Sequence, residues 1–293
     1  PWERGRAHVG PGCAARPASR AATPAARRSR FRGVCLVVLA GALGLPASTL
    51  FRLPQSPAEI LPLLPVMGRV MLSARFKGAI HERMGPVGTV TIADGKARLT
   101  GECHDSVIDL AVVKRIVVDR SGQMRDKALP KLECQDAAGE TLFSLIGLEG
   151  LEPFDAALAS LGAGAPLEPV LREAPSGGAQ DVAPEDLGAA TFAAILAEGL
   201  PIAIDFERPG LFQHWVGLLP EPKPSMGFVN VMQGDFHLHL QAGTVASWAR
   251  HQMVAEVVLR ALDAEGRETG LSLHGPAAAF AGVPCVREPA AHG

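Results

Sequence analysis

The 293-residue sequence contains no tyrosine, and only 5% of its residues are aromatic. No apolar run approaches the roughly 20 residues that a membrane-spanning helix needs. There is no CxxC pair, which excludes a zinc ribbon and a thioredoxin-type redox motif. A phosphate-binding glycine loop, a GxSxG elbow and an HExxH motif are also missing. Hydrolase and nucleotide-dependent activities therefore have no support, and we predict no catalytic residues and no membrane partner.

Charge is distributed unevenly along the chain. The formal net charge is −2, but residues 1–33 hold eight arginines against one acid, so residues 34–293 carry −9. An acidic body argues against a nucleic-acid partner, because nucleic-acid binding needs a basic face. The five cysteines are widely spread, which is typical of free thiols in a reducing compartment.

The N-terminal part allows two interpretations. Residues 1–33 are rich in Ala, Arg, Pro and Gly, and we predict a disordered or non-native extension there. The apolar stretch 34–45 follows an arginine cluster, so it resembles the h-region of a secretory signal, which would make the protein exported. It also fits two short helices, the first ending at Gly44 and the second beginning at Pro46. We favour the helices, which agree better with the family described below.

From residue 60 onward the pattern is that of β-strands. Strands are predicted at 69–72 and 89–92 with a turn at Gly85-Pro86, and 93–96 (Ala-Asp-Gly-Lys) is a strong hairpin signal. The segment 107–118 is rich in β-branched residues. Residues 131–135 and 141–146 form the arms of a further predicted hairpin.

The middle of the chain changes character. A helix is predicted at 153–161, and 162–184 is a Gly/Pro/Ala-rich linker. Another helix opens at Pro184-Glu185-Asp186 and stops at Gly199. Strands then return at 201–206, 212–218, 227–232, 236–240, 254–262 and 271–273.

The two halves of the chain resemble each other. The segments 132–147 and 259–275 both read as strand, Asp-x-x-Gly turn, strand and terminal Gly, with the turn residues Asp136 and Asp263 lying 127 positions apart. Upstream, 107–110 corresponds to 236–240. A period this long indicates duplication of a domain rather than a solenoid, although two unrelated hairpins would look similar.

Several weak motifs recur in a fixed order across both repeats. They are Gly68-Arg69-Val70-Met71, Ile80-His81-Glu82-Arg83-Met84-Gly85, Ile108-Asp109-Leu110, Phe228-Val229-Asn230-Val231, Phe236-His237-Leu238-His239-Leu240, Trp248 and the Asp263 hairpin that ends at Gly275. In this order they resemble the HemS/ChuX-type family of haemin-degrading and cytoplasmic haem-trafficking proteins, over roughly residues 36–276.

The resemblance implies an α+β fold, a duplicated antiparallel β-sheet domain with flanking helices. The first repeat with its N-terminal helices would span 34–161, the linker 162–184, the second repeat 185–276 and a disordered tail 277–293. It also implies a cytoplasmic protein of iron acquisition. Haem, its cofactor and partner, would lie in a cleft between sheet and helices and be passed on or reductively opened. Apart from the resemblance, we expect a homo-oligomer, such as a dimer, that forms through exposed apolar sheet faces.

The sequence departs from the family at the haem-handling positions. Members with two repeats carry a haem-ligating His at the start of the second repeat, whereas here no His lies between His104 and His214. The family's Trp-x-x-Arg-Lys element supplies cations for the propionates. Here it reads Trp248-Ala249-Arg250-His251, with the arginine one place early, and a slip of one residue turns a strand side chain to the opposite face. The family's pocket tyrosines have no counterpart.

Five residues remain candidates for haem binding, which requires an apolar slot, an axial donor for iron and cations for two propionates. His237 and His239 alternate on one predicted strand, so both imidazoles face the same side and either could ligate iron. His214 lies beside Trp215, whose ring could flank the macrocycle, and Arg250 could pair with a propionate. The simpler interpretation is that all five are ordinary core or surface residues.

No third ligand lies at a recognisable spacing from the histidine pair, so we predict no metal-ion site. The alternative to haem binding is a non-catalytic duplicated β scaffold that has lost haem and serves protein–protein interaction. Its support is the altered pocket together with the Pro/Gly-rich linker.

Overall fold

The computed structural model describes residues 49–162, 164–168, 181–284 and 286–287. The expectations for 1–33, for 34–45 and for much of the linker lie outside the described residues. The helices are α1 (Pro57–Ile60), α2 (Leu151–Leu158) and α3 (Leu187–Glu198), and the 3-10 turns are η1 (Leu61–Val66) and η2 (Ala277–Phe280). The strands before α3 are β1 (Leu50–Arg52), β2 (Arg69–Phe76), β3 (Ala79–Pro86), β4 (Thr89–Ala93), β5 (Lys96–Thr100), β6 (Asp105–Asp109), β7 (Arg115–Asp119), β8 (Gln123–Met124), β9 (Lys127–Ala128), β10 (Lys131–Gln135), β11 (Thr141–Gly147) and β12 (Ala165–Pro166). The strands after α3 are β13 (Ile202–Arg208), β14 (Leu211–Gly217), β15 (Lys223–Ser225), β16 (Phe228–Gln233), β17 (Phe236–Gln241), β18 (Ser247–Gln252), β19 (Val257–Leu262), β20 (Glu268–Gly275) and β21 (Val286–Arg287).

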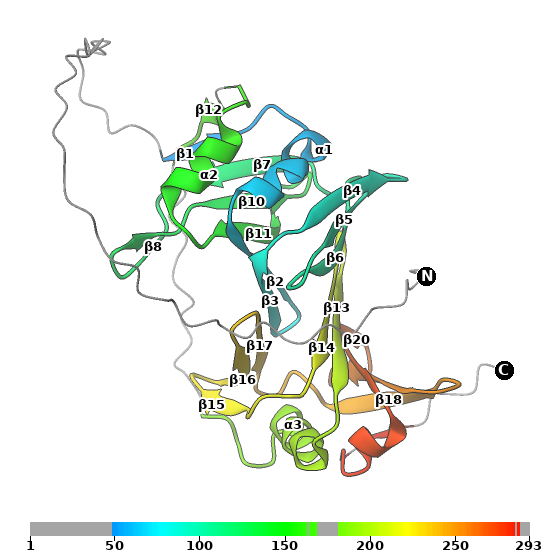
Figure 1. Cartoon of the computed structure of the whole chain (residues 1–293). Helices are drawn as coiled ribbons and strands as arrows, with labels where there is room; N and C mark the ends of the chain where they lie inside the picture. The colour runs from blue at the N-terminus through cyan, green and yellow to red at the C-terminus, as the bar shows by residue number, and fades with distance from the viewer. Residues whose placement is uncertain (1–48, 163, 169–180, 285, 288–293) are drawn as a thin grey trace, which may run out of the picture.

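Two large, mostly antiparallel sheets dominate the part of the chain that the structure describes (Figure 1). Sheet A has the strand order β12-β1-β7-β10-β11-β2-β3-β17-β16-β15. Sheet B has the order β21-β18-β19-β20-β13-β14-β6-β5-β4. Each sheet therefore contains strands from both halves of the chain.

The two sheets share one strand order, and each combines a run of strands from one half of the chain with a shorter run from the other half. In sheet A the run β7-β10-β11-β2-β3 continues into β17-β16-β15, and in sheet B the run β18-β19-β20-β13-β14 continues into β6-β5-β4. The antiparallel pairs β3–β17 and β14–β6 join the halves. The segments 107–110 and 236–240, which the sequence pairs as equivalent, fall largely on β6 and β17. These two strands hold corresponding places, so the predicted duplication of the sheet domain is confirmed.

Aromatic side chains fill the contact between the inner faces of the two sheets. His81 on β3 is fully buried, and its ring stacks on Phe206 of β13 with centroids 5.6 Å apart. Phe236 of β17 lies at the edge of the His81 ring at 5.1 Å and stacks on Trp215 of β14 at 4.5 Å. Burial, with a smaller contribution from the nearby Arg83, lowers the pKa of His81 to about 3, so this histidine is neutral in the folded protein.

Helix α3 is fixed at both ends by residues that the sequence identifies. The Asp186 carboxylate caps the helix by accepting from the Ala189 backbone N–H at 2.9 Å, and it also accepts from Gly243 N–H at 2.8 Å. Gly199 ends the helix in the left-handed region at φ 63°. The buried Thr191 hydroxyl accepts from the Trp248 indole at 2.8 Å, which ties the helix to β18. The predicted helix is therefore confirmed, and its buried side packs on the inner side of the sheets.

Two sequence predictions are wrong. The turn expected at Gly85-Pro86 is absent, because β3 runs through Gly85. The reversal lies earlier, at Lys77 and Gly78, which have φ values of 40° and 81°. The tail predicted as disordered from 277 begins with η2, where Phe280 is 2% exposed against the core. Among the described residues, no helix combines the length and hydropathy needed to cross a bilayer.

Candidate functional site

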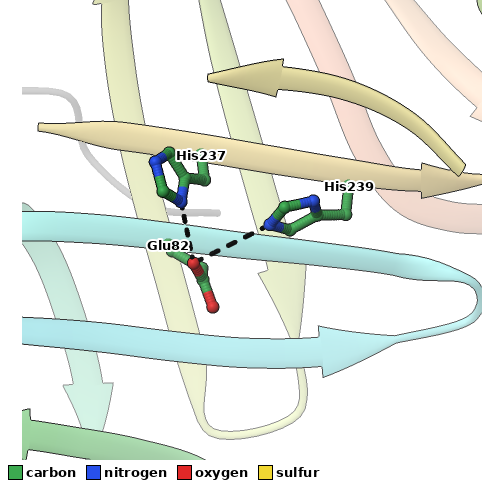
Figure 2. Close-up of side chains that lie close together, drawn as sticks. All are labelled: Glu82, His237 and His239. Carbon is green, nitrogen blue, oxygen red and sulfur yellow. Dashed lines mark hydrogen bonds and ion pairs between the residues drawn. The ribbon is translucent and has the colours of Figure 1, made fainter. Parts of the chain in front are cut away.

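The outer face of sheet A, opposite the aromatic core, carries a cluster of two imidazoles and one carboxylate. Glu82 comes from β3, and His237 and His239 come from the neighbouring β17 (Figure 2). The register places His237 directly opposite Glu82, and His239 follows two positions later on the same face. The Glu82 Oε2 atom lies 3.2 Å from His237 Nδ1 and 3.8 Å from His239 Nε2. The two predicted histidines thus come together, as expected, around a carboxylate that the sequence did not indicate.

Neighbouring side chains orient this cluster. The Ser73 hydroxyl donates to Glu82 Oε1 at 2.9 Å, and Asn230 Oδ1 lies 2.6 Å from His239 Nδ1. Burial alone would raise the pKa of Glu82, but the hydrogen bonds to His237 and Ser73 together with the neighbouring His239 outweigh it and lower the pKa to about 2. Glu82 is therefore a carboxylate at neutral pH and presents a permanent negative charge between the two imidazoles.

A second cluster occupies the outer face of sheet B. His214 Nδ1 lies 2.6 Å from Asp205 Oδ1, and His274 Nε2 lies 2.9 Å from Asp205 Oδ2. The Ser272 hydroxyl reaches His274 Nε2 at 3.1 Å. Burial raises the pKa of Asp205, yet the hydrogen bonds to His214 and His274 outweigh it and hold the pKa well below its usual range. His214 is thus held by a short, partly buried contact with Asp205, on a different sheet from His237 and His239.

The two remaining candidates do not join either cluster. Trp215 is 1% exposed and lies on the inner face of β14, where its ring stacks on Phe236. Strand alternation turns Trp215 inward when His214 points outward, and its role beside a bound macrocycle stays a prediction. Arg250 lies partly exposed on β18, opposite Leu259 of β19, and away from both histidine clusters in the strand order.

A groove of about 390 Å³ opens between α3 and the edge of sheet A that β15 and β16 form. Its lining is apolar except for one acid and consists of Val182, Ala183, Pro184, Ala189, Ala190, Ala193, Leu196, Glu221, Pro222, Pro224 and Val229. Glu221 also lines a smaller hollow of about 160 Å³ with Pro220, Lys223, Asn230 and Met232. The groove lies between a helix and a sheet, which is where the family resemblance predicts haem.

Sequence reasoning missed three of the charged or imidazole groups in these clusters: Glu82, Asp205 and His274. Glu82 is 155 positions from His237, so no local spacing connects them. Asp205 and His214 are nine positions apart on the two arms of one hairpin, and pairing those arms about the turn at Gly210 could have revealed their contact.

The fold resembles that of solved haem proteins. It matches holo-PhuS, a heme-binding protein from Pseudomonas aeruginosa, with a TM-score of 0.63 at 19% sequence identity, over 78% of this chain and 81% of that one. It matches ChuS, an E. coli heme oxygenase, with a TM-score of 0.62 at 15% identity, over 78% and 83% of the two chains. No protein-family model and no curated protein matches the sequence. The likeness confirms the α+β duplicated fold that the family resemblance implies.

Proposed function

We propose that this chain binds haem and carries it in bacterial haem utilisation. The observation that supports the proposal is the fold, shared over 78% of the chain with a heme-binding protein and with a heme oxygenase. These two proteins are similar at only 19% and 15% identity, so the ligand is inferred from the fold and must be tested on this chain.

The groove between α3 and β15–β16 is our proposed position for the macrocycle. Its volume of about 390 Å³ lies within the range of small-molecule pockets, and its lining is mostly apolar as in such pockets. Lys223 pairs with Asn230 and lines the smaller hollow on the opposite face of β15 and β16, and none of the groove's described lining residues is a cation, so we assign no propionate partner. The groove supplies no axial donor, because none of its described lining residues carries an imidazole, a thiol or a thioether. Haem would therefore be held chiefly by apolar contact, which suits a carrier that must release it.

The sequence-based prediction that haem contacts His214, His237, His239 or Arg250 is an alternative to the groove, because none of these four residues lines it. The two imidazoles of β17 converge on one point beside a carboxylate, whereas haem iron accepts a protein ligand only along the axis of its ring. We therefore expect that single alanine substitutions of these four residues leave haemin affinity within about threefold of the parent value, which is under 1 kcal/mol.

Haemin titration of the purified full chain tests the proposal. We expect the Soret band to shift from that of free haemin and to saturate at one equivalent. Ala193→Trp places an indole in the groove and should weaken binding by at least about tenfold, or 1.4 kcal/mol. Ala278→Trp adds the same ring at an exposed alanine of η2 and should leave the affinity unchanged.

Two outcomes would contradict the proposal. A Soret band that never departs from free haemin would remove haem binding and leave the duplicated β scaffold as the function. Equal haemin affinities for the Ala193→Trp and Ala278→Trp variants would refute the groove as the site.

We also propose that the protein works in the cytoplasm as a homo-oligomer. Cys134 is a buried free thiol, which supports a reducing compartment. Exposed apolar side chains such as Leu218 and Met226, at 62% and 77% exposure, support self-association. Light scattering coupled to size-exclusion chromatography should give a mass above that of one chain, and a monomer at all concentrations would contradict it.

A further inference from the structure

The cluster of Glu82, His237 and His239 is built like a metal centre. Within the described part of the chain, it is the group of His, Cys, Asp and Glu side chains whose donor atoms converge, all lying within 4.8 Å of one another. Figure 2 shows both imidazoles turned towards the Glu82 carboxylate. The side chains are 14%, 30% and 23% exposed, respectively, so an ion could enter from solvent and keep open positions.

The hydrogen bonds around the cluster set the donor atoms. The Asn230 amide nitrogen donates to the carbonyl oxygens of Lys223, Ser225 and Phe228 at 3.0, 3.3 and 3.2 Å, so its Oδ1 must face His239 Nδ1. An amide oxygen only accepts, hence Nδ1 of His239 carries the proton. In the neutral ring, Nε2 then presents its lone pair towards Glu82.

This arrangement places a lone pair against an anion. His239 Nε2 faces Glu82 Oε2 at 3.8 Å, and Ser73 occupies the other carboxylate oxygen. Either a second proton on the ring or a metal ion would remove the repulsion between these two atoms, and the approach of His237 Nδ1 to the same carboxylate oxygen suits a metal ion. Metal-ligating histidines commonly have their second ring nitrogen fixed by a neighbouring acceptor, as Asn230 does here.

We propose that Glu82, His237 and His239 bind one divalent transition-metal ion, with Ser73 and Asn230 as positioning residues. Two imidazoles and one carboxylate suit zinc or ferrous ions, whereas calcium and magnesium prefer all-oxygen sites. Zinc–ligand distances near 2.0–2.1 Å place tetrahedral ligand atoms roughly 3.3 Å apart. The Glu82–His237 separation of 3.2 Å already meets this requirement, and His239 must approach by about half an ångström. Three protein ligands leave a position for water or a small ligand.

The site would join the two halves of the chain. Glu82 belongs to β3 of the first half and both histidines to β17 of the second, and these strands form the seam of sheet A. A bound ion should therefore raise the melting temperature of the whole protein. This inference does not depend on haem binding, because the groove shares none of the three ligands.

Metal titration of the full-length, haem-free protein after treatment with EDTA tests the site. We expect calorimetry to show one equivalent of Zn²⁺ bound, and Co²⁺ to give visible d–d absorption typical of a four- or five-coordinate ion. Glu82→Gln, His237→Ala and His239→Ala should each weaken Zn²⁺ binding by more than about 100-fold, and Asn230→Ala by about 10- to 100-fold. The melting temperature should rise with Zn²⁺ in the parent protein but not in the Glu82→Gln variant.

His214→Ala is the matched control. His214 is also an outward strand histidine at 22% exposure, bonded to a carboxylate, but it lies outside the converging group. It should leave Zn²⁺ affinity unchanged. Absence of Co²⁺ absorption in the parent protein would overturn the proposal without recourse to any variant. Zn²⁺ binding that survives Glu82→Gln and His239→Ala, or that is lost in His214→Ala, would also overturn it.

Discussion

Replacing His81 by glutamine should remove a large part of the acid sensitivity of the fold. His81 is fully buried between the sheets, and burial lowers its pKa from 6.5 to about 3, with Arg83 acting in the same direction and Asp205 against it. The unfolded chain binds a proton at this residue below pH 6.5, and the folded chain does not. The contribution of the neutral ring to stability is therefore complete above pH 6.5 and is lost as the pH falls towards 3.

The size of the effect follows from proton linkage. One proton taken up only by the unfolded state costs about 1.4 kcal/mol per pH unit once that state is fully protonated. Since the unfolded histidine is half protonated at pH 6.5, lowering the pH from 6.5 to about 4.5 should cost about 2.3 kcal/mol. Glutamine does not titrate. It is also accommodated at the equivalent place in the second half: Gln213 is the third residue after Gly210, as His81 is after Gly78, and it is fully buried.

Urea denaturation of both proteins, with EDTA present to remove metal ions, measures this difference. The free energy of unfolding of the parent should fall between pH 6.5 and about pH 4.5 by about 2.3 kcal/mol more than that of His81→Gln. His251→Gln, at a partly exposed site on β18, serves as the control and should follow the parent. Parallel pH profiles for the parent and His81→Gln would refute the view that this ring is held neutral.

Other predictions concern two backbone glycines, the Asp205 carboxylate between His214 and His274, and the Asp186 helix cap. Gly270→Ala should lower the free energy of unfolding in urea by about 3 kcal/mol or more, because φ is +90° and a Cβ would collide with the Glu207 carbonyl. Gly266→Ala is the control: its φ is +76° but a Cβ would meet open space, so it should cost only about 1 kcal/mol. Asp205→Asn should lower the free energy of unfolding by about 2 kcal/mol at neutral pH in the same assay. Because the pKa of Asp205 is lowered from 3.8 in the folded protein, the parent should lose the stability that this carboxylate contributes as the pH falls below 3.8, whereas the Asp205→Asn variant should not. Asp186→Ala should destabilise the protein by about 1 kcal/mol through its lost cap, measured by thermal unfolding, and an unchanged melting temperature would contradict that role.

Local signals in the sequence predicted much of the local structure. The Asp94-Gly95 turn has φ values of 50° and 73° and closes the β4–β5 hairpin as expected. The turns after Asp136 and Asp263 close β10–β11 and β19–β20, each with its glycine in the left-handed region. Turn chemistry acts over four residues, so one sequence suffices to read it.

The candidate site could be predicted only in part, because its ligands come from distant strands. Alternation alone places His237 and His239 on one face, and the structure has them there. Their contact with Glu82 requires β3 to pair with β17, across the seam between the halves. Pairing of remote strands depends on the whole topology, which no local pattern encodes. The same alternation places Trp215 on the opposite face from His214, and the structure has it buried there.

Each half of the chain contributes strands to the sheet of the other half, and this exchange affects how fragments of the chain should behave when expressed. The boundary near residue 181 separates two homologous stretches of sequence, but β6-β5-β4 complete the sheet of the later stretch and β17-β16-β15 that of the earlier one. The N-terminal fragment would leave the edge of β3 unpaired and the C-terminal fragment that of β14, so each fragment should aggregate when produced alone. Co-production of the two fragments should restore a soluble heterodimer, because each fragment provides the strands that complete the sheet of the other.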